Sequence, residues 1–126
     1  KKILFILICL LMLTGCEEEP VEENKKVAPV NKITCNDVNT LLAEGAVVID
    51  VRTQEEYDTD HIENAININS ETIKYTIKGK IKDLDTPIIV YCQSGRRSAE
   101  SANELVNLGY TKVYDMGSIT TCYGEE

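Results

Sequence analysis

The sequence has a single histidine, His61, and its five cysteines include no C-x-x-C pair. Zinc sites in proteins use several closely spaced histidines and cysteines, so we expect no metal site and no other cofactor. Basic residues are also few, because 13 Lys and Arg stand against 21 Asp and Glu and give a net charge of −8. A chain this acidic is not expected to bind nucleic acid, or to be held on anionic lipid by charge.

The N-terminal part lacks an apolar run long enough to span a bilayer. The run from Ile3 to Leu13 has 11 residues, whereas a membrane-spanning helix needs about 20. A short apolar run after positive residues, here Lys1 and Lys2, is typical of a signal peptide. The run ends in L-T-G-C, which resembles the lipobox of bacterial lipoproteins. This resemblance implies cleavage before Cys16 and a lipid on Cys16; an uncleaved anchor or a plain signal peptide is the alternative.

We therefore divide the chain into three segments. Residues 1–15 are predicted to be a lipoprotein signal peptide. Residues 16–31 are predicted to be the lipidated cysteine and an acidic disordered tether, because they are rich in Glu, Lys, Val and Pro without an apolar period. Residues 32–126 are predicted to be one folded domain, expected to be a monomer. Loss of Lys1 and Lys2 would change the net charge from −8 to −10, so lipid alone would attach the chain to the extracytoplasmic face of the cell membrane.

Apolar runs alternate with helix-like patterns from residue 33 onward. Strands are predicted at residues 46–51, 65–68, 87–91 and 112–115. Helices are predicted at residues 34–44, 53–60 (a short helix or turn), 70–82 (interrupted at Gly79) and 98–108, and residues 116–126 are predicted to be a loop or frayed tail. This alternation predicts an α/β fold with a parallel sheet and helices on both faces, in which ligands bind at the carboxyl ends of the strands.

The segment after the strand at residues 87–91 is best suited to chemistry. Cys92 stands where the strand stops, and a helix-like pattern begins at Ser98. Backbone N–H groups and the positive end of a helix dipole converge at such a turn and favour the reactive thiolate. Gly95 allows the backbone to curl into an anion-binding nest, and an arginine suits sulfate-like or phosphate-like oxygens. A buried structural cysteine is the alternative, and the polar run after Cys92 argues against it.

Two sequence motifs, in this order, resemble the signatures of the rhodanese domain. Residues 50–68, DVRTQEEYDTDHIENAINI, resemble D-V-R-x-x-x-E-[YF]-x-x-G-H-I-x-G-A-x-N-I, and residues 92–98, CQSGRRS, resemble the active-site loop C-x-x-G-x-R-S. Residues 116–119 resemble the closing motif M-G-G-[IL]. The resemblance covers nearly everything from residue 33 onward. It implies a five-stranded parallel sheet flanked by helices, and sulfurtransferase activity.

The resemblance also implies roles for the loop. Cys92 would be the catalytic nucleophile, which takes sulfur from a small donor such as thiosulfate as a persulfide and passes it to a thiol or to cyanide. Arg97 would fit the oxyanion of the donor, whereas Arg96 is either a substrate contact or a solvated charge. The predicted substrate-binding residues are Gln93, Ser94, Gly95, Arg96, Arg97 and Ser98.

Three residues of the first motif are expected to support this loop or the fold. Asp50 and Arg52 are predicted to brace the loop by charge pairing rather than to take part in chemistry. His61 is predicted to be a hydrogen-bonded structural histidine. The spacing from Cys92 to Arg97 is C-x4-R, the short loop of the sulfurtransferases, whereas the related dual-specificity phosphatases use C-x5-R.

The chain also departs from the family pattern. Asp60 and Asn64 replace glycines of the first motif, Ser118 replaces the second glycine of the closing motif, and Cys122 lies where many members carry tryptophan. Cys122 could form a disulfide with Cys35 or resolve an oxidised or persulfidated Cys92. Two alternatives to a transferase therefore stay open. One is a non-catalytic rhodanese-like binding or sensing module, and the other is a thiol redox protein that pairs Cys92 with Cys35 or Cys122.

Overall fold

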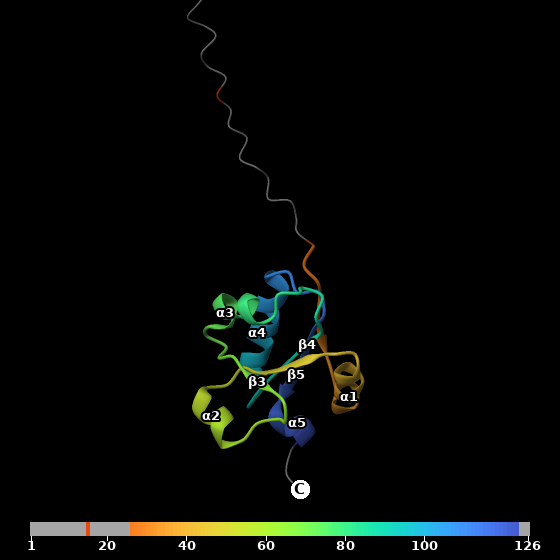
Figure 1. The fold of residues 1–126 in the computed structure, drawn as a ribbon, viewed down its shortest axis with the longest axis vertical. Coiled ribbons are helices and arrows are strands. Elements are labelled where there is room, and N and C mark those ends of the chain that lie inside the picture. The colour runs from red at the N-terminus through yellow and green to blue at the C-terminus, as the bar shows by residue number, and fades with distance from the viewer. Residues whose placement is uncertain (1–14, 16–25, 124–126) are drawn as a thin grey trace, which may run out of the picture.

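A computed structural model of the chain describes residue 15 and residues 26–123. The predicted signal peptide (except residue 15), Cys16 and the tether up to residue 25 lie outside the described residues. The described residues form a five-stranded parallel sheet flanked by helices, as predicted (Figure 1). None of the helices in this part of the chain is long and apolar enough to cross a membrane.

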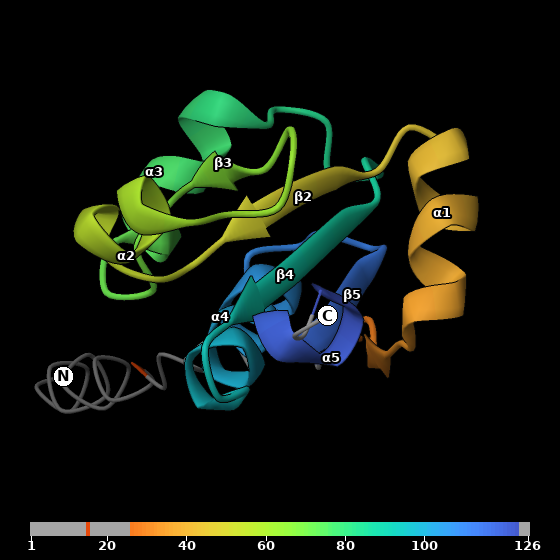
Figure 2. The ribbon, with the colours of Figure 1, turned by 90° about the horizontal axis from the view of Figure 1, so that it is seen from below.

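The sheet has the strand order β1-β5-β4-β2-β3, so β4 lies at its centre between β5 and β2 (Figure 2). All five residues of β4 are buried, as expected for the middle strand of a sheet that is covered on both faces. The strands are β1 (Val30–Lys32), β2 (Val47–Asp50), β3 (Ile66–Asn67), β4 (Ile88–Cys92) and β5 (Val113–Ser118). The helices are α1 (Cys35–Ala43), α2 (Gln54–Thr59), α3 (Ile73–Lys80), α4 (Arg96–Asn107) and α5 (Ile119–Tyr123).

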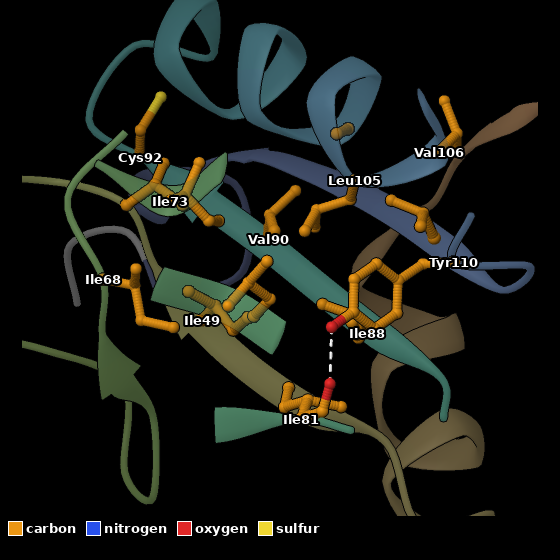
Figure 3. Packing of buried hydrophobic residues seen from close by; sticks show 14 residues of the cluster. Ile49, Ile68, Ile73, Ile81, Ile88, Val90, Cys92, Leu105, Val106 and Tyr110 are labelled. Carbon is orange, nitrogen blue, oxygen red and sulfur yellow. Dashed lines mark hydrogen bonds between the residues drawn. The ribbon is translucent and has the colours of Figure 1, made fainter. Parts of the chain in front are cut away.

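Alternation along β4 divides the core into two clusters. Ile88, Val90 and Cys92 pack with the apolar residues of α3 and α4, and Figure 3 shows this cluster. Ile89 and Tyr91 point to the other face and pack with residues of α1 and with Ile119 of α5. The two faces of this strand therefore carry the two core clusters, and Cys92 is its last residue.

Four elements differ from the sequence prediction. The structure adds β1, which begins at Val30 inside the predicted tether, and it carries β5 past Asp115 to Ser118. It also forms α5 where a loop or frayed tail was predicted, and α3 continues through Gly79.

In the edge strand β1 only Val30 is partly buried, so the strand has little apolar pattern. Its strand conformation follows from its pairing with β5. A register shift opposite Val90 and Tyr91 lets β5 continue beyond Asp115. Glycine inside a helix costs only about 1 kcal/mol, and the buried Ile73 and Ile77 hold α3 against the core.

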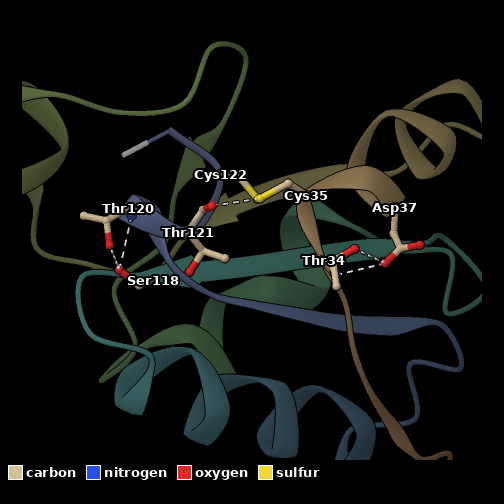
Figure 4. The surroundings of a disulfide bond; sticks show 7 residues. All are labelled: Thr34, Cys35, Asp37, Ser118, Thr120, Thr121 and Cys122. Atoms are coloured by element: carbon tan, nitrogen blue, oxygen red, sulfur yellow. Dashed lines mark hydrogen bonds between the residues drawn. A yellow bond between two sulfur atoms is a disulfide. The ribbon is translucent and has the colours of Figure 1, made fainter. Parts of the chain in front are cut away.

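A disulfide bond joins the two ends of the domain. Cys35, the first residue of α1, is bonded to Cys122 in α5 across a sequence separation of 87 residues, with 5.0 Å between the Cα atoms (Figure 4). A covalent loop of this size stabilises a fold by about 4.6 kcal/mol in the chain-entropy model. This pairing answers the question that the sequence left open, and it leaves Cys92 as the free thiol among the described residues. Cys122 is therefore engaged by Cys35 and not by Cys92.

Candidate active site

The loop after β4 folds its backbone around the sulfur atom of Cys92. The N–H groups of Gly95 and Ser98 donate hydrogen bonds to Sγ at 3.0 and 3.3 Å. Gly95 has a φ of +98° and stands directly before the first residue of α4. This left-handed conformation favours glycine, and it turns the two N–H groups and the start of the helix toward the sulfur. The environment stabilises negative charge on Sγ.

A buried ion pair lies beside this loop, at the end of β2. The Asp50 carboxylate accepts hydrogen bonds from the backbone N–H of Arg52 at 2.9 Å and from its Nη2 at 2.8 Å. It also accepts one from the Tyr91 hydroxyl at 2.8 Å. Asp50 and Tyr91 are both fully buried, and Arg52 is 4% exposed. The pKa of Arg52 is raised, chiefly by the hydrogen bond to Asp50, and burial raises the pKa of Tyr91 well above its usual value.

The Arg52 guanidinium connects this pair to the loop. Its Nη1 donates to the side-chain oxygen of Gln93 at 3.1 Å, and its Nη2 donates to the backbone carbonyl of Asp60 at 2.5 Å. The ion pair therefore holds the end of β2, the start of the active-site loop and the segment after α2 together. This is the position in which Asp50 and Arg52 can brace the loop.

Arg97 is paired with Glu56 of α2. Its Nη1 and Nη2 donate to the two Glu56 carboxylate oxygens at 2.9 and 3.1 Å. This hydrogen bonding is the main cause that lowers the pKa of Glu56 and raises the pKa of Arg97. Both terminal nitrogens of Arg97 are thus held by a carboxylate. The expectation that Arg97 meets the donor directly differs from this arrangement, in which Arg97 ties the start of α4 to α2.

Glu56 has no role among the residues predicted from the sequence, although a signal for it is present. Thr53 and Glu56 have the T-x-x-E spacing of a capping box, and Thr53 N–H donates to the Glu56 carboxylate at 3.1 Å. Glu56 is also the glutamate of the first motif. The Glu56 carboxylate is fixed at the first turn of α2 and binds Arg97 of the second motif. The sequence alone does not show that these two motif residues are in contact.

The remaining loop residues differ in exposure. The Arg96 side chain is 78% exposed, and its nearest carboxylate, that of Glu100, lies at 3.6 Å across one helical turn. Such an exposed ion pair contributes little to stability. Gln93 and Ser94 are exposed, whereas Ser98 is buried and its hydroxyl donates to the Gly95 carbonyl at 3.0 Å. Arg96 is therefore the cation of this loop whose charge faces solvent.

His61 stands apart from the sulfur. Its Nδ1 is 2.7 Å from the Tyr57 carbonyl oxygen, and its ring stacks on the Tyr57 ring with 3.8 Å between centroids. It borders a cavity of about 320 Å³ together with Asp60, Ile62, Glu63 and Ile119. These contacts fit a structural role. Asn64 and Asp60 lie where the family pattern has glycine. Asn64 has a φ of +65°, which asparagine tolerates, and Asp60 has an extended backbone.

A thiol cradled by backbone amides at the end of the central strand of a parallel α/β sheet defines a domain of the rhodanese type. The model of the rhodanese-like domain family matches residues 34–120, and the chain belongs to this family.

Related proteins agree with this assignment. The chain is 37% identical over 71 residues to "Thiosulfate sulfurtransferase PspE" of Escherichia coli K12, covering 56% of this chain and 68% of that protein. It is 32% identical over 96 residues to "Thiosulfate sulfurtransferase GlpE" of Pseudomonas entomophila, covering 76% of this chain and 81% of that protein. A solved structure described as a rhodanese with anions from E. coli has a TM-score of 0.60 and 32% identity, covering 64% of this chain and 94% of that one.

Proposed function

We propose that the chain is a sulfurtransferase that carries sulfane sulfur as a persulfide on Cys92. The chain is an enzyme of the thiosulfate sulfurtransferase type, the name that its curated relatives carry. The observation that supports the role of Cys92 most directly is the pair of hydrogen bonds from Gly95 and Ser98 to its sulfur. The Cys35–Cys122 disulfide favours a transferase over a redox partnership between Cys92 and either of these cysteines.

The reaction divides into two sulfur transfers. In the first, the Cys92 thiolate attacks the outer sulfur of thiosulfate, a new S–S bond forms, and sulfite leaves with the electron pair of the old S–S bond. In the second, a thiolate or cyanide attacks the outer sulfur of the persulfide, and the Cys92 thiolate leaves. Negative charge stays near Sγ throughout, where the N–H groups of Gly95 and Ser98 stabilise it. Because Cys92 is fully buried, part of the loop around it must move when the donor enters.

Intact mass spectrometry tests this function. Incubation of the full chain with thiosulfate is expected to add the mass of one sulfur atom, located on the peptide that contains Cys92. A chain that binds an oxyanion but never gains sulfur from thiosulfate, polysulfide or an alkyl persulfide would instead be a binding or sensing module.

Arg96 is the cation that we assign to the first contact with the donor. Because Arg97 is held by Glu56, the exposed Arg96 guanidinium is better placed to attract a doubly charged anion. Arg96→Ala is expected to raise KM for thiosulfate about tenfold with a smaller change in kcat, since it removes ground-state binding. Steady-state formation of thiocyanate measures both constants. Arg96→Lys, which keeps the charge, is the matched control, and an unchanged KM in Arg96→Ala would remove Arg96 from this role.

We further propose that the enzyme is anchored to the extracytoplasmic face of the cell membrane by a lipid on Cys16. The support is the L-T-G-C sequence after a short apolar run, and the acidic charge of the chain leaves lipid as the means of attachment. Expression in a bacterium with labelled palmitate is expected to label the wild type and to place it in the membrane fraction. Cys16→Ser is expected to abolish the label, whereas Cys9→Ser is expected to keep it. Label that persists in Cys16→Ser would contradict the anchor.

A further inference from the structure

The carboxyl end of β5 holds the base of the active-site loop. Ser118 is in register with Cys92 across the sheet, and its hydroxyl donates a hydrogen bond to the Gln93 carbonyl at 2.5 Å. A Cβ atom added to Gly95 would lie 3.8 Å from the Gly117 Cα, so the loop also packs on the backbone of β5. Both contacts join the loop to β5.

The hydroxyl of Ser118 is itself held by α5. The Thr120 N–H donates to Ser118 Oγ at 3.2 Å, and the two hydroxyl oxygens of Ser118 and Thr120 lie 2.7 Å apart. Since the Ser118 proton is directed to the Gln93 carbonyl, the Thr120 hydroxyl serves as the donor to Ser118. A continuous set of hydrogen bonds therefore leads from the loop into the first turn of α5, as Figure 4 shows for Ser118 and Thr120.

The disulfide fixes that helix. Cys122 lies two residues after Thr120 and is bonded to Cys35 at the start of α1. The short helix α5 has five residues and buries Ile119 in the core cluster of the α1 face. A helix this short is marginal by itself, so the covalent bond to α1 adds to the burial of Ile119 in holding α5 and, through Thr120, the Ser118 hydroxyl.

We propose that Ser118 is a positioning residue for the Cys92 loop and that the Cys35–Cys122 disulfide acts through it. The hydroxyl fixes the peptide group between Gln93 and Ser94, and thereby the direction of the amides that follow it and surround Sγ. The disulfide keeps α5 against the domain so that the hydroxyl stays in place. The inference rests on the proposed sulfur transfer and adds that a covalent bond remote from Cys92 sets the rate at which Cys92 is loaded.

The test follows the rate of sulfur loading at saturating thiosulfate by intact mass, on the full chain. Ser118→Ala is expected to lower this rate constant about tenfold, because a short hydrogen bond to the loop is lost. Ser118→Thr, which keeps the hydroxyl, is expected to retain most of the rate. Cys35→Ser/Cys122→Ser is expected to slow loading by a similar factor, and adding Ser118→Ala to it is expected to slow loading by no more than about twofold further, because both changes act on one contact. Thr121→Ala, at an exposed position of α5, is the control for α5 and is expected to load at the wild-type rate.

A purely structural role for the disulfide would give a different result. In that case Cys35→Ser/Cys122→Ser would unfold at a lower temperature but would load sulfur at the wild-type rate well below that temperature, which would overturn the inference. Faster loading in Ser118→Ala would also overturn it, because the hydroxyl would then restrain opening. If the double variant does not fold, the comparison of Ser118→Ala with Ser118→Thr still decides the role of the hydroxyl.

A failure of the proposed function is distinguishable from a failure of this inference. If the wild type gains no sulfur from any donor, the function is wrong, and the rate of Cys92 alkylation by iodoacetamide then reports on the loop in the same variants. Equal alkylation rates in the wild type and Ser118→Ala would reject the positioning role. Normal loading in the wild type with equal loading in all variants would reject the inference alone.

Discussion

Replacement of Cys92 with serine is expected to abolish sulfur loading, with a loss of turnover of at least about 10⁴-fold. A serine hydroxyl is not ionised near neutral pH, and oxygen does not form the covalent sulfur intermediate on which the two-step transfer depends. The fold should survive, because serine is close to cysteine in size and its oxygen can accept the hydrogen bonds from Gly95 and Ser98. Intact mass after thiosulfate treatment measures loading, and thiocyanate formation measures turnover.

Matched cysteine variants make this result specific. Cys9→Ser leaves Cys92 and the disulfide unchanged, so it is expected to load one sulfur atom like the wild type. Circular dichroism should show that Cys92→Ser keeps the secondary structure and unfolding temperature of the wild type. Persistence of the added sulfur in Cys92→Ser would show that another residue carries it, and the assignment of Cys92 would then be wrong.

The sequence predicted the elements whose signal is local. The buried strand that ends at Cys92, the glycine at the turn and the helix that follows each have a pattern within a few residues. Both β4 and α4 form there, although α4 begins at Arg96 and not at the predicted Ser98. Helix α1 likewise begins within one residue of its predicted start at Thr34, whose N–H donates to the Asp37 carboxylate at 2.9 Å. The parallel arrangement followed from the alternation of these elements.

Elements that depend on distant partners were missed. The strand β1 has three residues with little burial, and it is specified by pairing with β5 more than 80 residues later. Helix α5 has no strong apolar period, and it is joined to α1 by the disulfide to Cys35 and packs Ile119 in the core. This disulfide is compatible with the sequence but could not be predicted from it, because the separation of two cysteines along the chain does not give their distance in space.

The same limit applies to the site. The motifs identified Asp50, Arg52 and the Cys92 loop as neighbours, but they did not indicate that Glu56 pairs with an arginine of the loop. A sequence gives two arginines side by side in the loop, and only the structure distinguishes Arg97, which Glu56 holds with both oxygens, from Arg96, which is exposed. This difference is the reason why we propose Arg96, and not Arg97, for the first contact with the donor.

Replacement of Asp50 with alanine is expected to cost about 3–5 kcal/mol of unfolding free energy. Asp50 is fully buried, and its carboxylate accepts hydrogen bonds from Arg52 and from the Tyr91 hydroxyl. Alanine leaves the buried guanidinium without its counter-charge and Tyr91 without its acceptor. Urea unfolding measures this loss as a lower midpoint. Asp58→Ala, which removes an exposed carboxylate of α2, is the control and is expected to change the unfolding free energy by less than about 0.5 kcal/mol.

A second substitution separates the lost charge pair from lost packing. If the cost of Asp50→Ala comes mainly from the unpaired Arg52 charge, then adding Arg52→Met should recover part of the stability, since no buried charge remains. The double variant should still load sulfur more slowly than the wild type, because Gln93 has lost the hydrogen bond from Arg52 at 3.1 Å. A double variant that is less stable than Asp50→Ala would show that packing of the Arg52 side chain dominates. Recovered stability with slow loading would lead to two conclusions. The buried ion pair would orient the active-site loop, and it would lower the free energy of unfolding relative to a hydrophobic pair.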